Sequence, residues 1–239
     1  MGVSKRVSEW VERRFQVKHL MAQAHRTLNL AMPITHMERY KSRIFWIGYP
    51  LYYLGSISVV LFLILCATGI ILGLYYVPSA IGAPGEPTPA YRSVELIMTR
   101  VPLGYILRSI HHWSANLLIA SVTLHLLRVF FTSAYREPRE INWILGVILL
   151  AGTLFISFSG YLLPWDQLGY WASTIGLEMT KSVPIFGETL AQIVFGGSSM
   201  GPATLTRMYS FHVNLSMVGF GLIALHLILV FIQGIAEPH

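Results

Sequence analysis

The chain has 239 residues, of which 54% are hydrophobic and 12% are charged, and its mean hydropathy is +0.57. Soluble domains carry about a quarter charged residues, so this composition excludes an ordinary soluble protein and indicates a membrane protein. The net charge of +6 does not indicate nucleic-acid binding, because nine of the seventeen Lys and Arg residues lie in residues 1–43 beside three acidic ones. Such a flank is typical of the cytoplasmic surface of an anionic membrane. The single cysteine, Cys66, excludes an internal disulfide.

The basic N-terminal flank also carries large apolar residues. Residues 4–30 mix apolar side chains, beginning with Trp10, with basic ones such as Arg13. This mixture predicts an amphipathic helix that lies on the membrane surface and contacts its lipids. We therefore expect a cytoplasmic flank over residues 1–43 and a membrane domain over residues 44–239.

Four apolar segments follow, and each reaches the roughly 20 residues that a helix needs to cross a bilayer. They are predicted at about residues 45–76, 103–133, 141–163 and 205–233. A short polar turn with Arg136 and Arg139 joins the second segment to the third. An even number of crossings returns the chain to its starting side, and basic residues favour the cytoplasm, so both termini are predicted to be cytoplasmic.

The connections on the opposite side are longer. They predict short surface helices at about residues 91–99, 170–179 and 188–195. Trp165 and Trp171 would anchor the last connection at the membrane interface, where aromatic side chains are enriched.

Two of the apolar segments carry histidines at one interval. His111 and His125 lie 14 residues apart in the second segment, and His212 and His226 repeat this interval in the fourth. In a helix such a pair is separated by about 21 Å and returns to nearly the same face. A single membrane histidine is more often a packing or pore-lining group, but ionisable groups at depth are costly and indicate function. Four histidines that share one interval on two helices can instead form two pairs, one at each depth in the membrane.

Glycines repeat the same interval in the other two segments. Gly55 and Gly69 lie 14 residues apart, as do Gly146 and Gly160. Glycine in a membrane helix most often allows close helix packing. The shared interval adds a second interpretation, in which the glycines leave room for a flat cofactor at two depths.

Paired histidines at two depths suit haem iron better than zinc. Zinc would need three or four ligands at one level, which a separation of about 21 Å excludes. Two imidazoles per level instead suit a six-coordinate haem iron, and a haem without an open site carries electrons. Arg108 and Arg128, each three residues from a histidine, could hold haem propionates. Snorkelling to the membrane interface explains either arginine alone equally well.

Several motifs occur in a specific order along the chain. They are R-S-I-H-H-W-S-A with L-H-L-L-R-V, then G-Y-L-L-P-W-D-Q-L-G-Y-W-A, and then A-T-L-T-R-M-Y-S-F-H. Together they closely resemble cytochrome b of the quinol-oxidising cytochrome bc complexes, over about residues 45–234. The chain lacks the Pro-Glu-Trp-Tyr segment of that family's C-terminal half, so it is similar to the short, split form.

The resemblance implies an all-α membrane protein, in which a four-transmembrane-helix bundle encloses two stacked, non-covalent haems b and an amphipathic helix lies on the surface. His111 and His212 would ligate an outer, low-potential haem. His125 and His226 would ligate an inner, high-potential haem. The other cofactor-binding residues implied are Gly55 and Gly146 at the inner haem, Gly69 and Gly160 at the outer haem, and Arg108, Arg128 and Arg207.

The resemblance also implies a quinol oxidation site. Its wall would be formed by Tyr161, Trp171, Ala172 and Ile175. In such complexes a quinol gives one electron to a Rieske iron-sulfur protein and the other to the outer haem. The second electron crosses to the inner haem and reduces a quinone near the cytoplasm, while protons are released outside and taken up inside.

The implied setting is a multi-subunit quinol–cytochrome c reductase in a bacterial inner membrane or a photosynthetic membrane. The chain would not act alone. Its partners would be the Rieske protein, a c-type cytochrome, a separate subunit with the Pro-Glu-Trp-Tyr segment, and a second copy of the complex in a homodimer.

Two features depart from the split form. Tyr53 stands where some split members attach an extra haem through a cysteine, and the chain has no C-x-x-C-H motif, so no covalent haem c is expected. The 14-residue interval between His212 and His226 follows the fused respiratory form, whereas split members commonly have one residue more.

Two other functions fit paired histidines. A different dihaem cytochrome b, such as the quinone-linked subunit of another membrane dehydrogenase, would need neither the long P-W-D-Q connection nor a Rieske partner. A four-helix membrane scaffold or transporter would use the histidines as proton-relay or packing groups.

Overall fold

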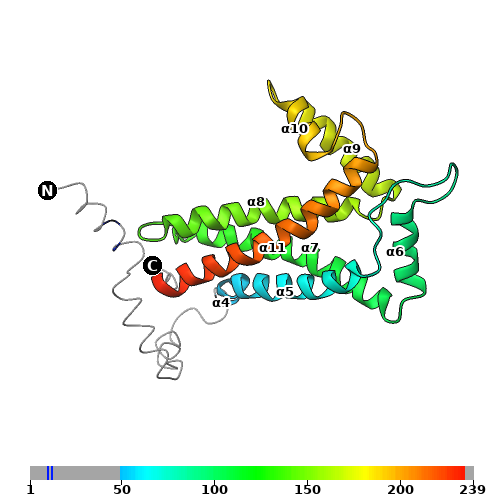
Figure 1. Cartoon of the computed structure of the whole chain (residues 1–239). Helices are drawn as coiled ribbons and strands as arrows, with labels where there is room; N and C mark the ends of the chain where they lie inside the picture. The colour runs from blue at the N-terminus through cyan, green and yellow to red at the C-terminus, as the bar shows by residue number, and fades with distance from the viewer. Residues whose placement is uncertain (1–9, 11, 13–48, 235–239) are drawn as a thin grey trace. The chain divides into compact units, whose positions relative to one another are not determined.

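The structure is a computed structural model that describes residues 10, 12 and 49–234. These residues form helices and no strand, in the order α4 to α11 (Figure 1). The amphipathic surface helix predicted over residues 4–30 lies outside the described residues, apart from Trp10 and Glu12. The described part of the chain is all-α, as the sequence predicts.

Four of the described helices are long and apolar enough to cross a membrane. They are α5 (Leu54–Gly73), α7 (Gly104–Phe131), α8 (Glu140–Leu162) and α11 (Pro202–Gln233). Large apolar residues on them are exposed: Ile70 by 72%, Phe131 by 77% and Met217 by 71%. Lipid solvates such side chains, whereas water does not. The four-span prediction is confirmed, and the chain is a multi-pass membrane protein.

The first span is shorter than the apolar segment that contains it. The short helix α4 (Tyr49–Tyr52) ends one residue before α5 begins, and Tyr53 forms a turn between them. After Gly73 the N–H groups of Tyr75 and Tyr76 bond back to the Leu72 carbonyl, at 3.1 Å each. Hydropathy cannot distinguish apolar turn residues from apolar helical ones, so the sequence predicted one continuous segment.

Capping residues set the beginnings of two shorter helices. Helix α6 (Pro89–Thr99) begins after Thr88, whose hydroxyl accepts the Tyr91 N–H at 3.3 Å. Helix α9 (Gln167–Lys181) begins after Asp166, whose Oδ1 accepts the Gly169 N–H at 2.8 Å. Both are favoured N-cap residues, because a side-chain oxygen satisfies an N–H that has no partner within the helix. The P-W-D-Q motif thus contains the start signal of α9.

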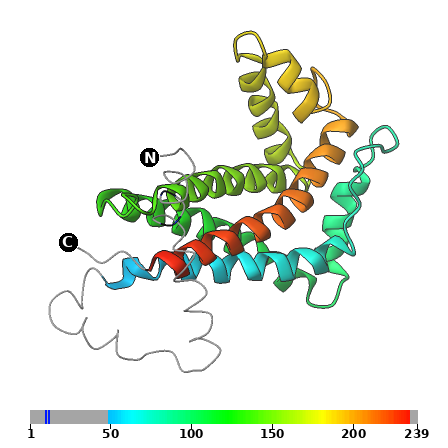
Figure 2. The same cartoon turned by 60° about the vertical axis from the view of Figure 1, so that its left-hand side comes forward.

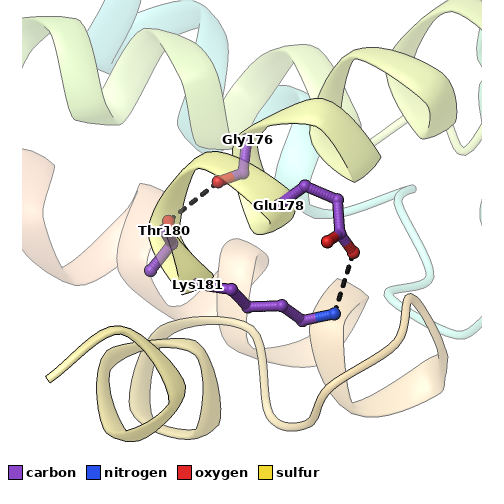
Figure 3. A network of polar contacts seen from close by, with 4 residues as sticks. All are labelled: Gly176, Glu178, Thr180 and Lys181. Carbon is purple, nitrogen blue, oxygen red and sulfur yellow. Dashed lines mark hydrogen bonds and ion pairs between the residues drawn. The ribbon is translucent and has the colours of Figure 1, made fainter. Parts of the chain in front are cut away.

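Side chains also hold the last turn of α9 (Figure 3). Thr180 Oγ1 donates to the Gly176 carbonyl at 2.8 Å, and Lys181 Nζ lies 2.8 Å from Glu178 Oε1. A lysine at a helix C-terminus is favourable because the helix dipole is negative there.

Helix α10 (Gly187–Val194) follows α9 and packs beside it (Figure 2). A β-carbon on Gly187 would overlap the Lys181 carbonyl, so only glycine permits this approach.

The described residues divide into two compact units. The first contains residues 49–58, 120–150 and 221–234, and the second contains residues 59–119 and 151–220. Each unit therefore takes one segment from each of the four long helices.

Polar contacts join α5 to α7 in the first unit. The hydroxyls of Ser58 and Ser121 lie 2.8 Å apart, and both bond to the Leu54 carbonyl, at 2.8 and 3.0 Å. Two small serines thus bring these helices close, as small residues do in membrane bundles.

An apolar cluster joins α8, α9, α10 and α11 in the second unit. Its fully or nearly fully buried members are Leu162, Leu177, Ala191, Phe195 and Met208. At the end of α5, Tyr76 donates its hydroxyl to the Leu163 carbonyl at 2.7 Å. Burial raises the pKa of the Tyr76 phenol above its usual range, so it stays neutral as this donor requires. The connection after α8 is therefore part of a packed unit rather than an idle loop.

Candidate metal centres

Two of the four repeated histidines face each other in the second unit, and we call them the outer pair. His111 lies on α7 and His212 on α11, with ring centroids 6.2 Å apart and ring planes inclined by 60°. Imidazole nitrogens bind first-row metals at about 2.0–2.1 Å, so two imidazoles on opposite sides of one metal place their centroids about 6 Å apart. The outer pair has the separation of two axial ligands.

Hydrogen bonds to Nδ1 set the tautomer of both outer rings. His212 Nδ1 lies 2.9 Å from the Ile156 carbonyl oxygen, which can only accept, so Nδ1 carries the proton. His111 Nδ1 lies 2.9 Å from Thr68 Oγ1. The Thr68 hydroxyl donates its own hydrogen to the Ile64 carbonyl at 2.7 Å, so it accepts from His111. Both Nε2 atoms are then left with the lone pair that binds a metal.

One glycine lies against each outer ring. A β-carbon on Gly69 would stand 3.2 Å from His111 Cε1, and one on Gly160 would stand 2.6 Å from His212 Cε1. Real side chains do not approach as closely as the second distance, so Gly160 leaves space that the His212 ring fills.

The other two repeated histidines, the inner pair, lie in the first unit. His125 on α7 and His226 on α11 are close enough to interact electrostatically. Gly55 faces the His125 ring and Gly146 the His226 ring, where β-carbons would stand 3.1 and 3.5 Å from Cε1. Each histidine of the chain's repeat thus has its own glycine, on α5 for the α7 histidines and on α8 for the α11 histidines.

The Nδ1 atoms of the inner pair lack the hydrogen bonds that those of the outer pair make. His125 Nδ1 is buried and makes no hydrogen bond to any residue that the structure describes. His226 Nδ1 is also buried and has no hydrogen-bond partner among the described residues, although its ring lies near the Asn142 backbone.

The residues fit a haem at each pair. Among the residues that the structure describes, no group of three or more His, Cys, Asp or Glu side chains is placed to hold a metal ion. Haem needs only two axial ligands from the protein because its macrocycle provides the other four. Two opposed imidazoles beside glycines without side chains match that requirement.

The first two predicted cofactor-binding arginines fall in different units. Arg108 lies in the unit of the outer pair, with Nη1 3.5 Å from Met98 Sδ. Arg128 lies in the unit of the inner pair, with its guanidinium carbon 3.9 Å from the centroid of the Tyr52 ring. Each is therefore placed with the histidine that lies three residues away along α7.

Arg207 has a role that the sequence did not indicate. Its Nη1 donates to the carbonyls of Gln192 and Ile193, in the last turn of α10. Cations are favourable at that end of a helix. The guanidinium nevertheless has further donors beyond Nη1.

The predicted quinol-site residues lie in the second unit. Tyr161 at the end of α8 is 48% exposed, and Trp171 and Ile175 on α9 are 59% and 63% exposed, while Ala172 is half-buried. Trp171 and Ile175 are four residues apart, so they share one face of α9. Trp171 Nε1 donates to Gln167 Oε1 at 2.9 Å.

Thr68 was missed by reasoning from the sequence. A polar residue directly before an interval glycine was the available signal, but threonine is common in membrane helices, where it bonds the carbonyl four residues earlier. The Ile156 carbonyl could not have been identified, because every residue has one.

Three comparisons with known proteins agree. A sequence model of the family described as Cytochrome b/b6/petB matches residues 42–234. Cytochrome b6 of Heliobacterium mobile is 43% identical over 188 residues, which cover 78% of this chain and 85% of that protein. Cytochrome b6 of Synechococcus sp. (strain JA-3-3Ab) is 41% identical over 188 residues, covering 78% and 84%.

A solved structure extends the likeness to the fold. A chain described as "Hyperthermophilic respiratory Complex III" superposes with a TM-score of 0.70 at 30% identity. The match covers 96% of this chain and 56% of that one, so this chain spans little more than half its length.

Proposed function

Because the chain belongs to the cytochrome b family, whose cofactor is haem b, we propose that it is the dihaem subunit of a quinol-oxidising cytochrome bc complex. It would carry one electron of each quinol through the membrane to a quinone. The observation that carries this proposal is that His111 lies opposite His212, that His125 lies close enough to His226 to interact electrostatically, and that a glycine stands against every ring. A scaffold that used its histidines only for packing would have no need of this arrangement.

Each histidine pair would hold one iron. His111 and His212 would bind the outer, low-potential haem, and His125 and His226 the inner, high-potential haem. Bound in this way, haem supplies one-electron chemistry without an open coordination site. The chain's own contribution is to fix the tautomers of the two outer rings and to leave space at the glycines for all four rings.

The arginines would neutralise the haem propionates. Arg108 is assigned to the outer haem and Arg128 to the inner one, since each shares a unit with that pair. Arg207 would use donors other than Nη1, which is occupied by the carbonyls of α10. Forked guanidinium donors suit carboxylates better than a lysine would.

Quinol would be oxidised beside Tyr161, Trp171, Ala172 and Ile175. Three of these four residues are exposed, which fits a site that a second subunit completes. The chain spans 56% of the respiratory complex III chain that it matches. We propose that a separate subunit with the Pro-Glu-Trp-Tyr segment supplies the rest of the site, as in the split form that the chain resembles.

The remaining steps belong to the assembled complex. The Rieske iron-sulfur protein would take the first electron of each quinol and pass it to a c-type cytochrome, while the second electron follows the haems of this chain. Protons would be released outside and taken up near the cytoplasm. The complex would be a homodimer in a bacterial inner or photosynthetic membrane, with both termini of the chain cytoplasmic.

Substitution of His111 and of the adjacent His112 tests which histidines bind the haem iron. His111→Leu and His212→Leu should each remove the same one of two b-type signals from the reduced-minus-oxidised spectrum of the purified complex. His112→Leu is the matched control, because His112 is exposed and bonds Asn116 instead. Its spectrum should keep both haems. Unchanged haem content in His111→Leu would contradict the proposed ligand pairing.

Copurification distinguishes the complex from another dihaem enzyme. A tagged chain should bring down a Rieske protein and a second helical membrane subunit. A haem-containing preparation with a dehydrogenase flavoprotein instead would identify the quinone-linked subunit of another dehydrogenase. A preparation with no haem spectrum would exclude both.

A further inference from the structure

The outer and inner pairs differ in the hydrogen bonding of Nδ1. Both outer rings have a partner at 2.9 Å, Thr68 Oγ1 for His111 and the Ile156 carbonyl for His212. In the inner pair, His125 Nδ1 is buried and has no hydrogen-bond partner in the described part of the chain. The clearest contrast is therefore between the two histidines of α7.

One residue on α5 accounts for this contrast. Thr68 directly precedes Gly69, which faces His111, and Leu54 directly precedes Gly55, which faces His125. The two positions are 14 residues apart, so they are equivalent in the repeat. Both side chains are buried, Thr68 to 7% and Leu54 to 9% exposure. Leucine offers no acceptor, so the inner ring lacks the hydrogen bond that the outer ring makes.

The hydrogen bond at Thr68 has an electronic consequence for an iron-bound imidazole. A proton donated from Nδ1 leaves more electron density on the ring and makes Nε2 a more basic ligand. A more basic axial ligand stabilises the oxidised, more positively charged iron and lowers its reduction potential. The Thr68 hydroxyl donates its own hydrogen to the Ile64 carbonyl at 2.7 Å, so its oxygen is available to accept the proton of His111 Nδ1.

We propose that Thr68 is a positioning residue that lowers the reduction potential of the outer haem through His111, and that Leu54 leaves the inner haem without this effect. The pair of residues thus helps to make electron flow from the outer to the inner level favourable. This inference rests on the proposed function, since it concerns the haems that the two pairs would bind.

The effect of Thr68 on the outer haem is tested by removing only its hydroxyl. Thr68→Val keeps the shape of the side chain, and Thr68→Ser keeps the acceptor. Potentiometric titration of the whole complex in membranes should show a higher midpoint potential for the outer haem in Thr68→Val. We expect a several-fold change in its oxidised-to-reduced ratio at fixed potential, where tenfold corresponds to about 59 mV for one electron. Thr68→Ser should stay near the parent value, and the inner haem should not move.

The role of Leu54 at the inner haem is tested by placing a hydrogen-bond acceptor at this position. Leu54→Thr should lower the midpoint potential of the inner haem, and Leu54→Val is the control that trims the side chain without a hydroxyl. If Thr68→Val fails to retain its haem, the midpoint potential of the inner haem in Leu54→Thr still tests the inference. A shift in Leu54→Thr that is absent in Leu54→Val supports the inference.

The failures of the two proposals are distinguishable. If the parent complex contains no b-type haem, the proposed function fails. If both haems are present but Thr68→Val and Leu54→Thr titrate like the parent, the inference alone is overturned. An equal shift in the threonine and valine variants of Leu54 would attribute the effect to packing and would also overturn it.

Discussion

The four interval glycines leave different amounts of space beside their histidines. A β-carbon would stand 2.6 Å from the ring at Gly160, 3.1 Å at Gly55, 3.2 Å at Gly69 and 3.5 Å at Gly146. Only the last is an ordinary van der Waals distance. Substitution should therefore have graded effects along α5 and α8.

Gly160→Ala should displace the His212 ring and weaken binding of the outer haem. Overpacking of this kind costs about 1–3 kcal/mol, which corresponds to a loss of affinity of about 5-fold to 150-fold. Gly152→Ala on the same helix is the control, because nothing lies within 4 Å of its β-carbon. The ratio of haem to protein in the purified complex measures the effect. Equal loss in both variants would show that helix packing, and not the ring, requires the glycine.

The sequence predicted these residues but not their immediate partners. A shared interval on four helices could be read from the sequence because helical geometry repeats at a fixed rise and angle. The Thr68 hydroxyl and the Ile156 carbonyl depend on how each helix is rotated and on the rotamer of each ring. Those are properties of packing, which no interval encodes.

Asp166 determines where α9 begins. The sequence predicted this helix from residue 170, because aromatic residues dominate the segment, whereas the cap places its start at Gln167. Reading Asp166 as an N-cap would have corrected the start. The break between α4 and α5 has no comparable capping signal, because the nearest proline, Pro50, lies three residues before Tyr53 and inside α4.

Removal of this cap should loosen the first turn of α9. Asp166→Ala should cost about 1 kcal/mol, whereas Asp166→Asn should be nearly neutral because asparagine caps equally well. Hydrogen exchange of the amides of residues 167–170 in the intact complex should be about fivefold faster in the alanine variant, since local opening follows local stability. Identical exchange in both variants would show that tertiary packing alone fixes this turn.

The four membrane spans in the described part of the chain imply that the connections between them lie on alternate sides of the membrane. Composition and apolar segments were sufficient to predict them, because a bilayer demands long helices with few charges. The proposed sidedness rests on the basic residues 1–43 and on Arg136 and Arg139. Partner subunits follow from the family resemblance, and not from any physical property of the sequence.

Thiol labelling tests this sidedness. In a Cys66→Ala background, Ala83→Cys, in the connection before α6, should react with an impermeant reagent in right-side-out membrane vesicles. Glu137→Cys, in the turn before α8, should react only after permeabilisation, because basic turns remain cytoplasmic. Both positions are exposed, so burial cannot explain a difference. The reverse labelling pattern would invert the proposed orientation.

The repeated glycines also restrict how this chain can change in length. One residue inserted between Gly146 and Gly160 would rotate the second glycine by about 100° around α8 and shift it by about 1.5 Å. A side chain would then stand where the His212 ring now lies, only 2.6 Å from a β-carbon at this site. Insertions and deletions should therefore be tolerated in connections such as residues 79–87 and 196–201, while the helical stretches between the two levels of histidines keep a fixed number of residues.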